Sequence, residues 1–242
     1  MNDDLVFRFP RDATRARCVL TEARVLEAVA PRLPLAVPAT KLLVRESVAW
    51  PWSYSAQTRL DGESGELRRP TGGDAAEVIA AALSALHDTP PPRGTPSATL
   101  PPARPLLARA REAAALVGID DERLGAPPPP SPLAPALCHG DLKGEHFLVD
   151  RAGRVSGIID WADASIVDPA RDFMGLVTWL GPAFAARVLE HYVPRTDDAF
   201  LARVLFYARC SAVEHVARTL RGTWQAPLEL VRRQLDYAFE EC

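Results

Sequence analysis

The segment His139-Gly140-Asp141-Leu142-Lys143-Gly144-Glu145-His146-Phe147-Leu148-Val149 decides the fold of this chain. It begins with the pair His139-x-Asp141. After four intervening residues it carries His146, a second side chain that could bind a metal ion. The apolar run Phe147–Val149 follows directly and predicts a short β-strand.

A second apolar run begins ten residues further on, where Gly157-Ile158-Ile159 ends in the pair Asp160-Trp161. The segment Arg151-Ala152-Gly153-Arg154 lies between the two runs and is typical of a turn. Two short strands joined by such a turn predict a β-hairpin.

This hairpin would bring Asp141, His146 and Asp160 to one of its ends. Asp141 could accept the proton of a hydroxyl group, while the other two side chains could hold Mg²⁺. An acid beside two metal-binding groups is the minimum apparatus for moving a phosphoryl group from ATP. The sequence therefore predicts a phosphoryl-transfer site at this end of the hairpin.

The segment Leu137–Phe173 resembles the catalytic core of the aminoglycoside phosphotransferase family, small-molecule kinases that share the protein-kinase architecture. Their pattern is His-x-Asp, four residues, Asn or His, a strand that ends in Ile-Asp-Trp, and then Asp-Pro-x-x-Asp. This chain has all three pieces in order, the last one as Asp168–Asp172. The resemblance implies an α+β, two-lobed, protein-kinase-like fold with a mainly helical C-terminal lobe.

The resemblance also implies a role for each residue of the motif. Asp141 would be the catalytic base, and Asp160 and His146 would hold Mg²⁺, an ion that prefers oxygen ligands. His139 would brace the loop through its ring nitrogens. Asp172 would hold the catalytic loop by hydrogen bonds to backbone groups.

The first thirty residues predict a strand followed by a helix. Leu5–Pro10 is typical of a strand, and apolar residues at helical spacing then continue to about Val29, with Asp12 as the helix cap. Arg8 stands where the family has a strand lysine that touches the nucleotide phosphates, and Glu22 stands where its partner carboxylate belongs. Arginine keeps the charge but has a wider, planar group; a surface salt bridge between the two is the alternative interpretation.

The division into lobes is predicted at a turn-rich break, Asp61–Gly65. Lys41–Trp50 and Ser53–Leu60 are expected to be strands, which gives a nucleotide-binding lobe of residues 1–60 and a helical lobe of residues 61–242. The resemblance implies that the break is the hinge whose backbone meets the adenine. Thr58 and Leu60, just before it, are therefore predicted to contact the nucleotide.

The small lobe is expected to be reduced. The family begins with a strand–loop–strand unit that covers the nucleotide phosphates, whereas this sequence starts four residues before the strand that carries Arg8. No glycine-rich phosphate loop precedes that strand in the sequence. We expect an exposed strand edge, and lower ATP affinity and catalytic rate as a consequence.

The helical lobe is predicted from apolar residues that recur at helical spacing. The expected helices cover Asp74–His87, Leu106–Val117, Arg171–Leu180, Ala183–Tyr192, Asp198–Leu220 and Pro227–Phe239. Trp161, Trp179 and Trp224 are expected in the core. Acidic residues of the last helices could receive a cationic antibiotic, although a solvated helix face is the more common role of such residues; they are Glu214, Asp236, Glu240 and Glu241.

Composition excludes several classes of function. The 242 residues carry a net charge of −3 with acids and bases mixed, so no basic stripe suggests nucleic acid. No apolar stretch approaches the ~18 residues of a membrane span. The four cysteines are scattered, and the N-terminus lacks an apolar signal region, which together indicate reduced thiols and a cytoplasmic location.

We therefore expect ATP- or GTP-dependent phosphorylation of a hydroxyl on a small molecule, with an aminoglycoside or similar antibiotic as the favoured acceptor. Two alternatives remain open. The first is a kinase of an ordinary metabolite, such as an amino alcohol or a sugar. The second is a non-catalytic relative that binds nucleotide or ligand without turnover, because its phosphate cradle is incomplete.

Overall fold

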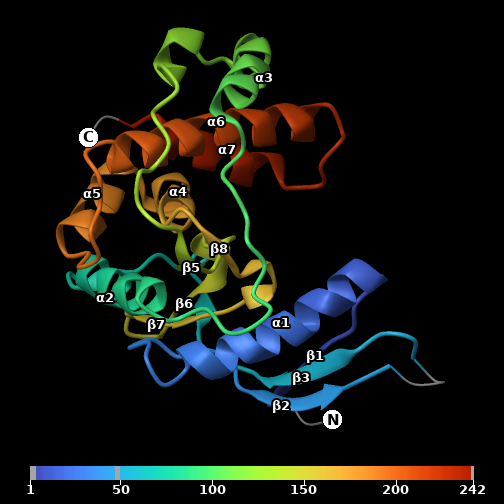
Figure 1. Cartoon of the computed structure of the whole chain (residues 1–242). Helices are drawn as coiled ribbons and strands as arrows, with labels where there is room; N and C mark the ends of the chain where they lie inside the picture. Colours follow the sequence, from blue (N-terminus) through green and yellow to red (C-terminus); the bar gives the residue numbers. More distant parts are fainter. Residues whose placement is uncertain (1–3, 47–49, 241–242) are drawn as a thin grey trace.

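The computed structural model describes residues 4–46 and 50–240. A small antiparallel sheet lies at one end of the molecule, the catalytic hairpin lies in the middle, and most of the helices lie at the other end (Figure 1). The helix α1 (Ala13–Val29) runs beside the small sheet and contacts it. Asp12 caps α1, as predicted, by accepting a hydrogen bond from the backbone N of Arg15 at 2.9 Å.

The small sheet has the strand order β1-β3-β2, with bounds Leu5–Arg8, Tyr54–Thr58 and Thr40–Val44. β1 ends two residues before the predicted Pro10, because proline has no N–H to donate to a ladder. β2 ends at Val44, six residues before the predicted Trp50. Val44 pairs with Tyr54, the first residue of its partner β3, so later residues of the predicted strand have no partner in β3. Residues 47–49 of that prediction lie outside the described residues.

The edge strand β1 pairs with β3 alone among the described residues. The side chains of Phe7 and Phe9 are 52% and 51% exposed, although Phe9 stacks on Tyr54. The expected exposed strand edge is therefore present in the small sheet.

The predicted hairpin is confirmed. β6 (Phe147–Val149) pairs with β7 (Val155–Ile158), and Asp150 holds the turn by accepting hydrogen bonds from the backbone N of Ala152 and of Arg154, at 2.8 and 2.9 Å. Gly153 has φ 79°, a conformation that favours glycine.

A short strand, β4 (Glu63–Ser64), extends the hairpin into a three-stranded sheet of order β4-β6-β7. The predicted break at residues 61–65 thus contains a strand that pairs with β6, a contact between segments too far apart for local turn signals to reveal. Beside this sheet, β5 (Ala136–Cys138) pairs with β8 (Ser165–Val167), and β5 leads directly into the loop that begins at His139.

The helical part of the chain closely follows the predicted boundaries. The helices are α2 (Ala75–His87), α3 (Ala103–Val117), α4 (Ala170–Leu180), α5 (Pro182–Glu190), α6 (Phe200–Leu220) and α7 (Leu228–Ala238), with 3₁₀ turns η1 (Asp121–Leu124), η2 (Gly144–His146) and η3 (Trp161–Asp163). α3 begins three residues before the predicted Leu106, because Pro105 is tolerated in the first turn of a helix.

The hydrophobic core is centred on α4, which packs against α5, α6 and α7. Phe173 on α4 and Val204 on α6 are both fully buried. Trp161 and Trp179 are also in the core, as predicted, with 0% and 1% of their surface exposed. Among the described residues, no helix has both the length and the apolar character to cross a membrane.

Gly175 lets α4 approach the catalytic loop closely. A Cβ atom at this position would overlap the backbone carbonyl of Leu142. Leu142 directly follows Asp141, so this contact sets the distance between the helix and the loop. By contrast, a Cβ atom at Gly73 would meet no atom within 4 Å.

We predict that Gly175→Ala lowers the free energy of unfolding by about 1–3 kcal/mol, because overlap with backbone outweighs the better helix propensity of alanine. Urea denaturation measures the change. Gly73→Ala is the matched control, and its effect is expected to stay within about 0.5 kcal/mol. Equal stability of Gly175→Ala and the unmodified protein would show that the helix can move away from the loop without cost.

Candidate active site

The catalytic loop is held in place by one buried carboxylate. Asp172 on α4 is 0% exposed, and its two oxygens accept hydrogen bonds from the backbone N of His139 at 2.8 Å and of Gly140 at 2.9 Å. Gly140 has φ 84°, and a Cβ atom there would overlap the carbonyl of Asp163. The predicted role of Asp172 as the anchor of the loop is borne out by these contacts.

Asp172 is itself supported by a buried pair. His87 on α2 lies with its Nε2 atom 3.1 Å from Asp172 Oδ2, and its Nδ1 atom is 2.6 Å from the hydroxyl oxygen of Tyr192. Burial raises the pKa of Tyr192, so its hydroxyl keeps the proton that it donates to Nδ1. Burial by itself would raise the pKa of Asp172, but the hydrogen bonds from His87 and Gly140 outweigh it, and the pKa is lowered.

Cys138 lies beside this pair. The ligand atoms of His87, Cys138 and Asp172 all lie within 4.8 Å of one another. However, both ring nitrogens of His87 and both oxygens of Asp172 already take part in hydrogen bonds. Burial also raises the pKa of the Cys138 thiol, which disfavours the thiolate that binds metals. The cluster is therefore suited to support the loop and not to hold an ion.

His139 braces the start of the loop. Its Nε2 atom donates to the carbonyl of Ile159 at 3.0 Å, and its Nδ1 atom accepts from the backbone N of Asp141 at 3.3 Å. The side chain is completely buried, and burial lowers its pKa, which favours the neutral ring that these two bonds require. The predicted bracing role is confirmed by this geometry.

Asp141, His146 and Asp160 meet at the end of the hairpin. His146 donates from Nδ1 to the backbone carbonyl of Asp141 at 2.8 Å, which leaves the lone pair on Nε2. Nε2 lies 3.5 Å from Asp160 Oδ2. Asp160 has φ 64°, a strained conformation for a residue with a side chain, and such strain often occurs at functional sites.

Arg8 reaches the same site from the small sheet. Its Nε atom is 3.4 Å from Glu22 Oε2 on α1, so the predicted partner is in place. Its Nη2 atom donates to Asp160 Oδ1 at 2.6 Å, a contact that the sequence did not predict. These residues are 152 positions apart, and only the packing of α1 against η3 brings them together.

The pKa values of the two carboxylates that contact Arg8 shift in opposite directions. Burial raises the pKa of Glu22, and Arg8 offsets this only in part. Burial would also raise the pKa of Asp160, but the hydrogen bond and the charge of Arg8 outweigh it, and the pKa is lowered. Glu22 is the more deeply buried of the two carboxylates, whereas Asp160 lies nearer to the guanidinium group, at 2.6 Å against 3.4 Å.

Thr58 and Leu60 lie where the chain leaves β3. The Thr58 hydroxyl accepts a hydrogen bond from the backbone N of Ala39 at 2.9 Å, so this side chain is used inside the sheet. Leu60 lies close to Gly157 of β7. The structure does not bring either side chain into the cluster around Asp160, and their predicted contact with a nucleotide stays a prediction.

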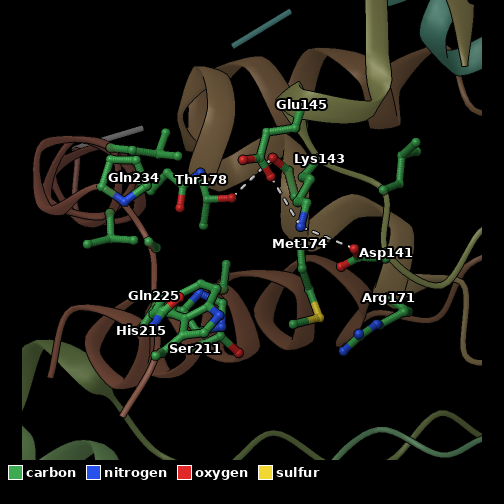
Figure 2. Close-up of a pocket in the computed structure, with 18 residues that line it drawn as sticks. Asp141, Lys143, Glu145, Arg171, Met174, Thr178, Ser211, His215, Gln225 and Gln234 are labelled. Atoms are coloured by element: carbon green, nitrogen blue, oxygen red, sulfur yellow. Dashed lines mark hydrogen bonds and ion pairs between the residues drawn. The ribbon is translucent and has the colours of Figure 1, made fainter. Parts of the chain in front are cut away.

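A cavity of about 480 Å³ opens on the other side of Asp141. Its walls come from the catalytic loop, α4, α6 and the segment that includes α7 (Figure 2). Lys143 lies between Asp141 and Glu145, with its Nζ atom 3.1 Å from Asp141 Oδ2 and 3.2 Å from Glu145 Oε2. Sequence reasoning passed over Lys143, although it stands inside the motif, two residues after Asp141.

Trp224 lies in the connection between α6 and α7, where it packs against the hydrophobic core, as predicted, and also lines the cavity. Glu214 pairs with Arg109. Neither it nor Asp236 nor Glu240 lines the cavity, and Glu241 lies outside the described residues.

Residues 2–203 match the phosphotransferase enzyme family. The uncharacterized protein YcbJ of Bacillus subtilis (strain 168) is 47% identical over 57 residues, which are 24% of this chain and 19% of that protein. Viomycin phosphotransferase of Streptomyces vinaceus is 42% identical over 60 residues, which are 24% of this chain and 21% of that enzyme. The chain thus matches about a fifth of the length of each of these curated relatives.

Solved structures give longer matches. The GDP complex of aminoglycoside 2'-phosphotransferase-IIIa has a TM-score of 0.71 at 23% identity and covers 98% of this chain and 85% of its own. Macrolide 2'-phosphotransferase type I has a TM-score of 0.62 at 26% identity and covers 96% of this chain and 83% of its own. The predicted two-lobed, kinase-like α+β fold is confirmed.

We predict that Asp172→Asn lowers the free energy of unfolding by roughly 3 kcal/mol or more at neutral pH, because the amide cannot accept all the bonds that the buried carboxylate accepts. The folded-state pKa of Asp172 is lowered, so its stabilisation is present above the unfolded pKa near ~4 and is lost as the pH falls below it. The difference in free energy of unfolding between Asp172→Asn and the unmodified protein should therefore become smaller at acidic pH.

Urea denaturation at several pH values measures this difference. Glu77→Gln is the control, because the side chain of Glu77 is 64% exposed and interacts only weakly with His191. A stability difference that stays constant between neutral and acidic pH would contradict the assigned ionisation of Asp172.

Proposed function

Because this chain belongs to the phosphotransferase enzyme family, we propose that it transfers the terminal phosphate of ATP or GTP to a hydroxyl group of a small molecule, with an antibiotic as the favoured acceptor. The aminoglycoside phosphotransferase membership predicted from the motifs in Leu137–Phe173 is thereby confirmed. Viomycin phosphotransferase and macrolide 2'-phosphotransferase type I are named for different antibiotics, so the residues of this chain's own cavity are the guide to its acceptor.

One observation carries the proposal. A single side chain, His146, connects the backbone carbonyl of Asp141, at 2.8 Å, with the carboxylate of Asp160, at 3.5 Å. Asp141 also borders a cavity large enough for a drug-sized molecule. A proton acceptor, a carboxylate for a metal ion and a space for an acceptor molecule are therefore adjacent.

Asp141 acts as the base in the proposed reaction. The acceptor oxygen forms a bond to the terminal phosphorus, the bond from that phosphorus to its bridging oxygen breaks, and the hydroxyl proton passes to the carboxylate of Asp141. The side chain of Asp141 is 35% exposed, so a hydroxyl group can reach it from the cavity. Lys143 holds the carboxylate in position through its ion pair.

Asp160 and His146 are the residues that would hold Mg²⁺. The donor set fits, because a carboxylate oxygen and an imidazole lone pair face each other across 3.5 Å, and the hydrogen bond from Nδ1 keeps that lone pair directed at the carboxylate. When bound, the ion supplies positive charge to the phosphate groups of the nucleotide.

The small lobe supplies the remaining nucleotide contacts in this proposal. Arg8 would bind phosphate oxygens, and its ion pairs with Glu22 and with Asp160 support this role because they hold the guanidinium group beside the proposed metal site. The backbone around Thr58 and Leu60 would meet the base. The division at residues 1–60 and 61–242 separates these nucleotide contacts from the acceptor cavity.

Nucleotide consumption across a panel of aminoglycosides, macrolides and small metabolites tests the proposal. Thermal stabilisation by Mg²⁺ with ATP or GTP is measured in parallel. Turnover with at least one hydroxyl acceptor is expected. Stabilisation by nucleotide without turnover on any acceptor would instead favour a non-catalytic binding protein.

We predict that Asp141→Ala lowers turnover by on the order of 10²–10⁴-fold and leaves nucleotide affinity nearly unchanged, because a positioned base is lost. Steady-state kinetics and calorimetric nucleotide titration measure the two quantities. Glu145→Gln is the matched control, since it removes the other carboxylate that pairs with Lys143. An Asp141→Ala protein with more than about half of the original turnover would refute the role of the base.

We predict that Asp160→Asn weakens nucleotide binding more in the presence of Mg²⁺ than in its absence, because a charged oxygen ligand is lost. Calorimetric titrations with and without Mg²⁺ measure the two affinities. Arg8→Met is the companion variant, since it breaks the ion pair with Asp160 but keeps the carboxylate. An equal loss under both conditions for Asp160→Asn would mean that the residue only binds Arg8.

A further inference from the structure

The cavity beside Asp141 contains equal numbers of acidic and basic side chains. Its lining includes two carboxylates, on Asp141 and Glu145, and two cations, on Lys143 and Arg171. We propose that the acceptor of this enzyme is a hydroxylated, largely apolar molecule that carries at most one positive charge, and that polycations are poor acceptors. This inference rests on the proposed function and names the acceptor class of the same site.

Both carboxylates of the cavity already have a partner. Lys143 lies within 3.1 Å of Asp141 Oδ2 and within 3.2 Å of Glu145 Oε2, so one ammonium group neutralises part of each charge (Figure 2). A ligand with several ammonium groups would have to displace Lys143 to gain an ion pair. Displacement would leave the half-buried ammonium group of Lys143 without its ion pairs, which offsets part of the new interaction.

Arg171 adds a positive charge that has no carboxylate partner among the described residues. Its Nε atom donates to the backbone carbonyl of Gly140 at 2.6 Å, and no ion pair is formed by its guanidinium. Figure 2 shows Arg171 on the far side of Asp141 from Glu145. A cationic group that approaches Asp141 from this side therefore meets repulsion.

His215 contributes no negative charge and little positive charge. Burial lowers its pKa to about 4, with the neighbouring Arg218 and Lys143 acting in the same direction. The ring is therefore neutral near pH 7 and can donate and accept hydrogen bonds with hydroxyl groups. It lies against the ring of Trp224, with the centroids 4.3 Å apart.

The rest of the lining is apolar or uncharged. Aliphatic, thioether and aromatic side chains provide a large apolar surface; they include Leu142, Met174, Trp224, Pro227, Leu230 and Val231. Uncharged hydrogen-bonding groups are spread between them, on Thr178, Ser211, Gln225 and Gln234. Apolar walls with a few uncharged polar groups suit a glycoside with an apolar body.

Among the described residues that line the cavity, Asp141 and Glu145 are the only ones with a carboxylate. Glu66 pairs with Arg233, and Glu214 pairs with Arg109. Neither glutamate lines the cavity. The cavity lining therefore offers a polycation only carboxylates that already contact Lys143.

Calorimetric titration of the full chain with two probes tests the inference. The probes are kanamycin, a sugar with several amines, and erythromycin, a largely apolar glycoside with a single amine. Erythromycin is expected to bind at least about tenfold more tightly, a ratio that corresponds to about 1.4 kcal/mol. Tighter binding of kanamycin, or binding of neither probe, would overturn the inference.

Added carboxylates provide a second measurement. Gln234→Glu and Gln225→Glu each place a negative charge on the cavity wall, and each should raise kanamycin affinity by roughly fivefold to tenfold and erythromycin affinity by less. The gain should decrease at high salt. Leu228→Glu is the matched control, because Leu228 is on α7, is 38% exposed and does not line the cavity. Unchanged kanamycin affinity in both cavity variants would contradict the argument from charge.

Phosphorylation assays with the same probes separate this inference from the proposed function. The expected binding order without any transfer of phosphate would refute the proposed function and leave the acceptor class in place. Faster phosphorylation of kanamycin than of erythromycin would support the proposed function and overturn the acceptor class.

Discussion

The carboxylate of Asp172 is the interaction on which the rest of the site depends. It is completely buried, and it accepts hydrogen bonds from two successive backbone N–H groups of the catalytic loop and from His87. A buried charge is tolerable only when it is fully hydrogen-bonded. The loop can therefore adopt this one conformation at low cost, and that conformation places Asp141 beside His146 and at the wall of the cavity.

A second constraint connects the small lobe to the hairpin. Arg8 contacts Glu22 on α1 and Asp160 after β7, and it lies closer to Asp160. The lowered pKa of Asp160 keeps this carboxylate ionised, which both a guanidinium group and a metal ion require. The carboxylate that the proposed metal site uses is thus also a point of contact with the small sheet.

The charge balance of the cavity supports the proposed acceptor class. The loop residue Lys143 neutralises part of the charge of the two acids that a cationic acceptor would need, and Arg171 adds a further positive charge. The acidic residues that the sequence offered for a cation face elsewhere, because the helical periodicity directs Glu214 toward Arg109 and away from the cavity. The proposed acceptor class therefore rests on side-chain direction and not on composition.

The sequence by itself determined the elements and the members of the site. Periodicity and turn residues located the hairpin and the helices. The predicted boundaries differ by two or three residues where a proline lies at the end of an element, as at the end of β1 and the start of α3. The spacing of the motif identified Asp141, His146 and Asp160, because a hairpin converts short sequence separations into proximity.

Tertiary structure alone decided the contacts between distant segments. These are the pairing of β4 with β6, the contact of Arg8 with Asp160, and the walls of the cavity. Each depends on how whole elements pack against one another, and local propensity carries no information about such packing. For the same physical reason the sequence could name a phosphoryl-transfer site, whereas only the folded chain could show which charges face the acceptor.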